Sequence, residues 1–200
     1  MIILTRFCSS ISNSFPELQH ELPWRITGEA ESIIHAKIKT LGPEFSVRHN
    51  IAIHRNAQVE DHVTLKGPLI ISAECFLAAH AYLRGGVYLG EKVCIGPGCE
   101  VKSSFILPHT TLAHFNFAGD SIIGSYVNME AGSIIANHYN ERDNKLINVM
   151  IDGKKVTTQS TKFGALVGDH SKIGANAVLS PGTILLPYSI VNRLQLIEQG

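Results

Sequence analysis

Large aliphatic side chains recur at every sixth position through much of the chain. One series consists of Leu41, Val47, Ile53, Val59, Leu65, Ile71, Leu77, Leu83, Leu89, Ile95, Val101, Leu107 and Ala113. A second series follows four residues behind it; its members are mostly apolar and many are small, and glycine, proline and polar residues lie between the two series. An amphipathic helix would repeat every 3.6 residues and a half-buried strand every two. A period of six instead predicts short strands joined by tight corners.

Repeats of six residues specify a parallel β-helix, in which three hexads close one triangular coil. Residues 18 apart then lie one above the other, about 4.8 Å apart along the stack. The sequence therefore predicts an all-β fold, a single-stranded parallel β-helix over residues 43–187 with stacked aliphatic columns as its core. The pattern stops at His114, resumes displaced at Phe117, and recurs over residues 167–185 after a polar stretch.

Three segments lie outside this repeat. Residues 138–163 are too polar to form a coil, and Asp152-Gly153 within them favours a tight hairpin turn, so we expect an excursion loop there. Residues 1–42 are predicted to form an extension with a short helix that Thr27 caps and Gly42-Pro43 ends. That helix is expected to plug one open end of the β-helix, and residues 188–200 are expected to cap the other.

Composition narrows the function classes. Lys+Arg and Asp+Glu both number 17, so the formal charge is zero and there is no basic footprint for nucleic acid or an anionic membrane. No apolar stretch approaches the roughly 20 residues that span a bilayer, and the first residues lack a signal-peptide pattern. Four cysteines without a CxxC pattern are too few for a disulfide framework. We expect a cytoplasmic protein with reduced thiols.

The ten histidines include one at the break in the repeat. A zinc site from His80, His109 and His114, as in γ-class carbonic anhydrases, would need ligands separated by near-multiples of 18, and the step from His80 to His109 is not one. No metal is therefore expected. His62 and His80 are 18 apart and should stack on an exposed corner. His114 differs because departures from a regular pattern often mark functional sites, and an imidazole suits proton removal near neutral pH.

Four stretches carry a resemblance to a known family: "AYLRGG", "CEVKSS", "LAHFNFAGDSIIGSYVNMEAGSIIANHYN" and "KFGALVGDHSKIGANAVLSPGT". Together they resemble hexapeptide-repeat acyltransferases, most of all the acetyltransferase domain of the bifunctional N-acetylglucosamine-1-phosphate uridylyltransferase/glucosamine-1-phosphate acetyltransferases and their archaeal sugar-1-phosphate relatives. The resemblance covers roughly residues 47–187. It implies left-handed coils, a homotrimer, and transfer of an acyl group from acetyl-CoA, as co-substrate, to an amino sugar or sugar phosphate.

The same resemblance assigns roles to eight residues. His114 would be the general base that takes a proton from the attacking sugar amine. The substrate contacts would be Arg84, Lys102, Asn128, Asn137 and Lys145. Backbone at Gly168 and Ala175 would line the coenzyme A groove. Arg84 and Lys102 are 18 apart, so we expect two stacked cations with no acid between them, which repel unless an anion bridges them.

Two positions depart from the family pattern. Phe117 stands where the family has an aromatic hydroxyl, and Glu130 stands where it has glycine. No Gly-rich nucleotide loop precedes the repeat, so uridylyl transfer is not expected. Two other functions stay open: a non-catalytic β-helix that binds sugar nucleotides or serves assembly, and a metalloenzyme similar to the γ-class carbonic anhydrases.

Overall fold

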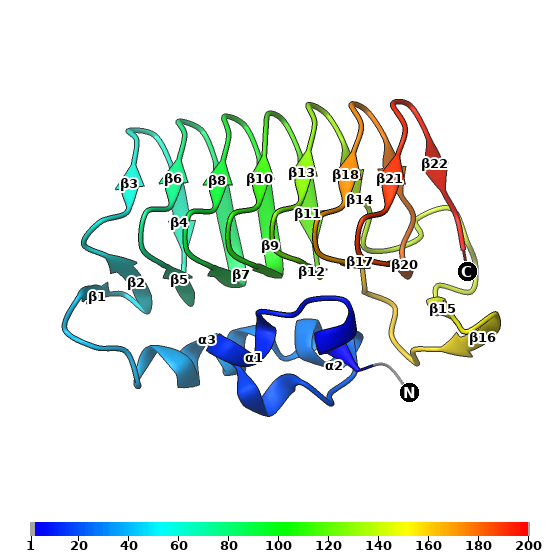
Figure 1. The fold of residues 1–200 in the computed structure, drawn as a ribbon, viewed down its shortest axis with the longest axis horizontal. Coiled ribbons are helices and arrows are strands. Elements are labelled where there is room, and N and C mark those ends of the chain that lie inside the picture. Colours follow the sequence, from blue (N-terminus) through cyan, green and yellow to red (C-terminus); the bar gives the residue numbers. More distant parts are fainter. Residues whose placement is uncertain (1–2, 200) are drawn as a thin grey trace.

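The chain winds into a prism of stacked coils with a layer of helices along one side (Figure 1). The computed structural model describes residues 3–199. Each coil contributes one short strand to each of three faces, and each strand pairs in parallel with the strand one coil further along. The all-β parallel β-helix predicted from the six-residue repeat is confirmed, and so are the left-handed coils that the family resemblance implies.

Three faces make up the prism. The first face consists of β3 (Gln58–Val59), β6 (Phe76–Leu77), β8 (Cys94–Ile95), β10 (Thr111–Leu112), β13 (Asn128–Met129), β18 (Lys172–Ile173) and β21 (Ile190–Val191). The second consists of β4 (Thr64–Lys66), the first halves of β7 (Tyr82–Leu89) and β9 (Glu100–Ile106), β11 (Phe117–Gly119), β14 (Ile134–Ile135), β19 (Val178–Leu179) and β22 (Leu196–Ile197). The third consists of β2 (Ile51–His54), β5 (Leu69–Ile71), the second halves of β7 and β9, β12 (Ile122–Ile123), β17 (Ala165–Val167) and β20 (Thr183–Leu185). Before β2, β1 (Phe45–Arg48) pairs antiparallel with it.

Aliphatic columns fill the interior of the prism, one behind each face. The first-face column is Leu77, Ile95, Leu112, Met129, Ile173 and Val191, all buried. Because every coil places its apolar side chain directly over the previous one, burial of these columns is the main stabilising term of the fold.

The repeat shortens earlier than the sequence pattern indicated. Leu83 pairs with Val101, a full coil of three hexads further on, but Ile95 pairs with Leu112, one position short of that spacing. The coil becomes one residue shorter in the middle of β9. There a single residue, Ser103, stands opposite the two residues Gly85-Gly86, which form a bulge in β7. The prediction that the repeat breaks at His114 was therefore wrong. The inward positions are Ile106, Leu112 and Ala118, not Leu107, Ala113 and Phe117.

Residues 136–164 leave the prism at the corner between the second and third faces. They include an antiparallel hairpin of β15 (Asn148–Ile151) and β16 (Lys154–Thr157), which turns at Asp152-Gly153 as expected. Beneath the excursion the prism is continuous, because Ile123 pairs directly with Val167.

The N-terminal layer covers the third face and does not plug the end of the prism (Figure 1). It consists of the 3-10 helices η1 (Leu4–Arg6) and η2 (Pro16–Leu18) and of α1 (Ile11–Ser14), α2 (Pro23–Gly28) and α3 (Ala30–Ile38). The reason is that the outward side chains of this face are apolar, among them Ile70, Phe105 and Leu166, and they form a second hydrophobic cluster with the helices. Thr27 is buried inside α2 and caps no helix.

Specific contacts fasten this layer. The Asp169 carboxylate accepts hydrogen bonds from the Ser9 N–H at 2.9 Å, the Ser9 hydroxyl at 2.7 Å and the Ser125 N–H at 2.7 Å. Gly86 lies against the start of α3, where a Cβ atom would come within 2.5 Å of the Ala30 carbonyl carbon.

The parallel coils extend to β22, so the segment predicted as a C-terminal cap instead adds strands to two faces of the prism. Among residues 3–199, no helix is both long and apolar enough to cross a membrane.

Candidate functional site

The outward surface of the second face carries two stacked cations, Arg84 and Lys102, in register as predicted. Each has its own acid, which corrects the expectation that none lies between them. Arg84 Nη2 lies 2.7 Å from Glu100 Oε1, and both side chains are about one third exposed. Lys102 Nζ lies 2.8 Å and 3.0 Å from the two Asp120 carboxylate oxygens, and this pair is largely buried. No bridging anion is needed to hold the cations in place.

Asp120 joins this pair to the excursion loop. Its carboxylate accepts a hydrogen bond from the Asn137 amide, and its carbonyl accepts one from the Gly164 N–H at 2.9 Å. The Phe163 N–H in turn donates to the Asn137 carbonyl at 3.0 Å. Asn137, which the resemblance assigns to substrate, is therefore buried where the excursion leaves and rejoins the prism.

A cavity of about 520 Å³ opens beside these residues, between the second face and the start of α3. Its walls include Arg84, Lys102, Ser103 and Asp120 from the prism, residues 27–32 from the helical layer, and Lys162 from the excursion. Three cations and three carboxylates line it, so it suits a polar ligand that both accepts and donates hydrogen bonds. Lys162 adds a cation that the sequence did not single out.

His114 lies at the corner between the first and second faces, three residues before β11 begins. Its backbone is held on both sides: its N–H donates to Asn116 Oδ1 at 3.1 Å, and its carbonyl accepts from the Gly132 N–H at 2.9 Å. Its imidazole is exposed, and within residues 3–199 it has no hydrogen-bond partner. The ring is thus presented outward from a fixed backbone, at the edge of the face that carries Lys102.

Buried Asn116 holds this corner in shape. Its Nδ2 donates to the Glu130 carbonyl at 2.8 Å and to the Ser133 hydroxyl at 2.9 Å, one coil further on, while its Oδ1 fixes His114. The sequence pattern did not single out Asn116, because a polar residue beside a presumed break looked like part of a loop.

A second groove, of about 490 Å³, runs along the first face near the His114 corner, and Asn128, Glu130, Lys172 and Arg193 line it. Glu130 Oε2 accepts from the Ala175 N–H at 3.0 Å and from Arg193 Nε at 3.0 Å. The hydrogen bond from Arg193, and after it that from Ala175, lowers the pKa of the Glu130 carboxyl below its ordinary value. The Ala175 N–H that the resemblance assigns to coenzyme A is therefore donated to Glu130.

The remaining assigned residues lie apart. Gly168 is buried at the corner between the third and first faces, packed under Pro187, whereas Ala175 lies at the next corner along the coil. Lys145 is exposed on the excursion and lines none of the cavities described here. Phe117 opens β11 opposite Glu100, and its ring lies over Gly119.

The other histidines form stacks. His62 and His80 are stacked as expected, with ring centroids 5.6 Å apart. His109 belongs to a column at another corner, His109–Tyr126–His170–Tyr188, whose successive rings are 4.5 to 4.9 Å apart and nearly parallel. Across residues 3–199, no group of three or more His, Cys, Asp or Glu side chains is arranged to hold a metal ion.

The sequence analysis did not predict that Glu100 and Asp120 belong to the site, although their positions relative to Lys102 indicate it. Glu100 stands two residues before Lys102, on the same side of the strand. Asp120 stands three hexads after Lys102, the spacing by which the repeat alone would stack the two, although in the structure Gly119 is the residue directly opposite Lys102.

Comparison with known proteins finds relatives whose names describe them as bifunctional. A bifunctional sugar-1-phosphate nucleotidylyltransferase/acetyltransferase from Sulfurisphaera tokodaii is 32% identical over 72% of this chain and 42% of its own length. The bifunctional protein GlmU of Methanococcus vannielii is 32% identical over 88% of this chain and 44% of its own, and that of Synechococcus elongatus is 35% identical over 72% and 28%. The chain thus spans less than half the length of these relatives.

These similarities confirm the resemblance inferred from the sequence. No family model matches the chain. Among solved structures, AntD, an N-acyltransferase from Bacillus cereus described with dTDP and coenzyme A, aligns over 78% of this chain and 80% of its own at 12% identity, with a TM-score of 0.33.

Proposed function

We propose that this relative of the bifunctional sugar-1-phosphate nucleotidylyltransferase/acetyltransferases transfers an acetyl or other acyl group from coenzyme A to an amino sugar or sugar phosphate. The observation that carries the proposal is the placement of His114. Its exposed imidazole, on a doubly hydrogen-bonded backbone, borders the same face that presents Arg84 and Lys102. In this proposal a proton acceptor borders the face on which two cations suited to a phosphate lie.

His114 acts as a general base in this proposal. The acceptor nitrogen attacks the thioester carbon while the imidazole takes a proton from that nitrogen. The carbon–sulfur bond then breaks, and the departing sulfur receives the proton as the free thiol. Proton removal by a positioned imidazole typically raises a rate by about 10²–10⁴.

The acceptor would bind in the cavity beside the second face. Arg84, Lys102 and Lys162 can donate hydrogen bonds to a phosphate, while Asp120 can accept one from a sugar hydroxyl. Asn137 would act indirectly, by holding Asp120. Lys145 would have to reach the acceptor from the exposed part of the excursion.

Coenzyme A would lie in the groove along the first face, next to the His114 corner. Lys172 and Arg193 line it as cations for the coenzyme's phosphates, and Asn128 can hydrogen bond there. Binding to the Ala175 N–H requires that the Glu130 carboxylate first moves away, which breaks both its hydrogen bond from Ala175 and its ion pair with Arg193. An exposed ion pair of this kind costs little to break. Gly168 lies at another corner and is not part of this groove.

We further propose a homotrimer, in which a neighbouring subunit completes the site. An outward apolar column on the second face, Phe117–Ile134–Val178–Leu196, starts next to His114. Ile134 is 38% exposed and Leu196 is 59% exposed in the single chain. Contact with a second copy would bury this column and enclose the imidazole. The four free cysteines suit the reducing cytoplasm, which we propose as the compartment.

The test is release of free thiol from acetyl-CoA in the presence of a panel of amino sugars and their phosphates. We expect His114→Ala to lower the rate by about 10²-fold or more. His35→Ala is the matched control, since His35 is an exposed histidine on α3 and should leave the rate unchanged. Equal rates for both variants and the unmodified protein would remove His114 from the mechanism.

A second candidate function is a β-helix that binds a sugar phosphate or sugar nucleotide without turnover. It is favoured by Glu130, which occupies the Ala175 N–H, and by Phe117, which has no hydroxyl to offer a substrate. Calorimetric binding of an amino-sugar phosphate together with no thiol release for any acceptor would support it over transfer.

A further inference from the structure

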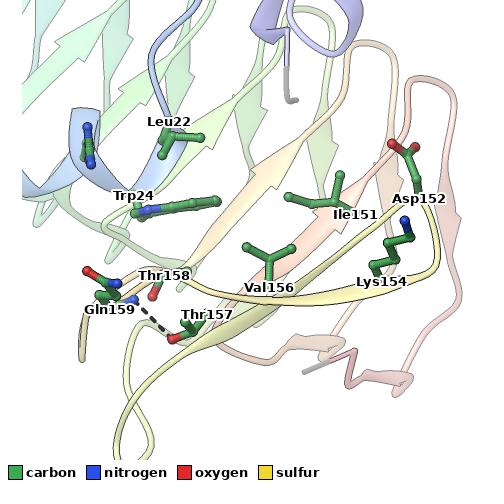
Figure 2. Close-up of a pocket in the computed structure, with 10 residues that line it drawn as sticks. Leu22, Trp24, Ile151, Asp152, Lys154, Val156, Thr157, Thr158 and Gln159 are labelled. Carbon is green, nitrogen blue, oxygen red and sulfur yellow. Dashed lines mark hydrogen bonds between the residues drawn. The ribbon is translucent and has the colours of Figure 1, made fainter.

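A separate cavity of about 550 Å³ lies between α2 and the β15–β16 hairpin of the excursion. Leu22, Trp24, Ile151 and Val156 form its apolar walls, from two segments that lie far apart in the chain. Figure 2 shows the Trp24 indole and Ile151 approaching from opposite sides, with Val156 between them. A volume of this size falls in the range of small-molecule sites, roughly 300–1,000 Å³.

The walls of this hairpin cavity are held by packing beneath it. The Trp24 ring meets the buried Phe163 ring edge to face, with centroids 5.9 Å apart. The Thr158 hydroxyl donates to the Ile147 carbonyl at 2.8 Å, which fixes the hairpin on the prism side. Val156 remains 37% exposed, so an apolar side chain on an otherwise polar strand faces an open hollow.

The rim of the cavity has an excess of positive charge. Arg25 and Lys154 line it as cations and Asp152 as the one acid. Within residues 3–199 Lys154 makes no ion pair, and Arg25 has only a long 3.8 Å contact to Glu21 with its side chain mostly exposed. Apolar walls under a cationic rim match a molecule with an apolar body and one anionic group.

We propose that the hairpin cavity is a binding site for such an amphipathic anion, a carboxylate with an apolar chain or ring. Its apolar body would lie between Trp24, Ile151 and Val156, and its carboxylate would meet Lys154 at the hairpin turn. None of the residues assigned to acyl transfer lines this cavity, so the ligand is neither acceptor nor coenzyme. Binding would clamp the excursion onto the helical layer.

The sole tryptophan of the chain lies in this wall, which gives a direct readout. We expect decanoate to change the Trp24 fluorescence saturably. Val156→Glu, which places a carboxylate at an exposed position inside the hollow, should abolish the change. Lys154→Gln should weaken decanoate binding by up to about fivefold, the size of an exposed ion pair. Its matched control is Lys155→Gln, on the same strand but outside the lining.

Three results would overturn the proposal: no saturable change with decanoate, an unchanged titration in Val156→Glu, or equal weakening by Lys154→Gln and Lys155→Gln. Decanol tests whether the ligand needs a negative charge. If the protein bound this neutral alcohol as tightly as decanoate, the part of the proposal that requires an anionic group would be wrong. Circular dichroism of each variant establishes that it is folded. Thiol release plays no part in these readouts, so they stand apart from the outcome for His114.

Discussion

Asp120 is the residue that joins the charged surface of the second face to the excursion. It neutralises Lys102, accepts the Asn137 amide, and accepts the Gly164 N–H through its carbonyl. Because the Lys102–Asp120 pair is largely buried, loss of one partner leaves an uncompensated charge in a poorly solvated position.

We therefore expect Asp120→Asn to lower the free energy of unfolding by about 3 kcal/mol. The matched change in the more exposed pair, Glu100→Gln beside Arg84, should lower it by less than about 1 kcal/mol. Urea denaturation followed by circular dichroism measures both. Similar losses in the two variants would contradict the difference in burial that we assign to them.

Cysteine reactivity gives a second test at this scale. Burial raises the pKa of the Cys75 thiol to about 12 and raises the pKa values of Cys8 and Cys99. Cys94 lies on the first face and is only half-buried, although burial raises its pKa in the same direction. Since the thiolate is the reactive form, native protein at pH 8 should be alkylated by iodoacetamide mainly at Cys94.

Peptide mass spectrometry after timed labelling checks this expectation, and all four cysteines should react in urea. Faster labelling of Cys75 than of Cys94 in the native protein would show that the core columns open more readily than the structure indicates.

The contact between β7 and α3 decides whether the helical layer can dock on the third face. Gly86 and Gly153 both have positive φ, but only Gly86 is crowded: its Cβ would meet the backbone of Ala30 and Glu31, while that of Gly153 would meet nothing within 4 Å. Substitution of Gly153 therefore measures the backbone strain alone, whereas substitution of Gly86 adds a steric clash with α3.

Gly153→Ala should cost roughly 1–2 kcal/mol, the strain of a left-handed alanine. Gly86→Ala should cost about 3 kcal/mol or more, because α3 must also move away from the prism. Hydrogen exchange of residues 30–38 should accelerate in Gly86→Ala alone. Unchanged exchange there would mean that the helix tolerates the added carbon.

At the level of elements, the sequence predicted the strands well and the helical layer poorly. Counting by six located the inward residues from Leu65 to Val101, whereas Val47 and Val59 are exposed. Beyond Val101 it chose Leu107 over Ile106, because both are aliphatic and the sequence does not reveal that a corner is one residue shorter. The helices were expected at the end of the prism because the outward apolar side chains Ile70 and Phe105 were not read as a second buried surface.

The site was predictable in part, for a related reason. The spacing of 18 placed Arg84 over Lys102 correctly, but the acids that pair with them come from a neighbouring position and the next coil. The burial of Asn137 depends on where the excursion leaves the prism, and the exposure of His114 depends on its place at a different corner. The six-residue spacing does not reveal either position.

For the molecule as a whole, the prism holds together across the excursion without help from the connecting chain. The strands on either side pair directly on all three faces, as in Asn128 with Lys172 and Ile134 with Val178. We expect the protein to remain folded when the chain is cut within residues 143–146, which are exposed.

A recognition sequence for a site-specific protease inserted between Asn144 and Lys145 tests this. After cleavage, the two fragments should elute together from a gel-filtration column and should separate only in denaturant. Fragments that part under native conditions would show that the excursion itself ties the last coils to the rest.

The corner between the second and third faces differs in length from coil to coil, while the columns on either side of it stay aligned. It is one residue shorter in the coils of β9 and β11 than in that of β7, and in the coil of β14 it releases the whole excursion, yet the strands beyond it still meet their neighbours. Insertions and deletions at a corner therefore do not propagate along the stack. Evolution can lengthen, shorten or recharge one edge of such a molecule at a time, and so revise what it binds, without redesigning the scaffold that presents it.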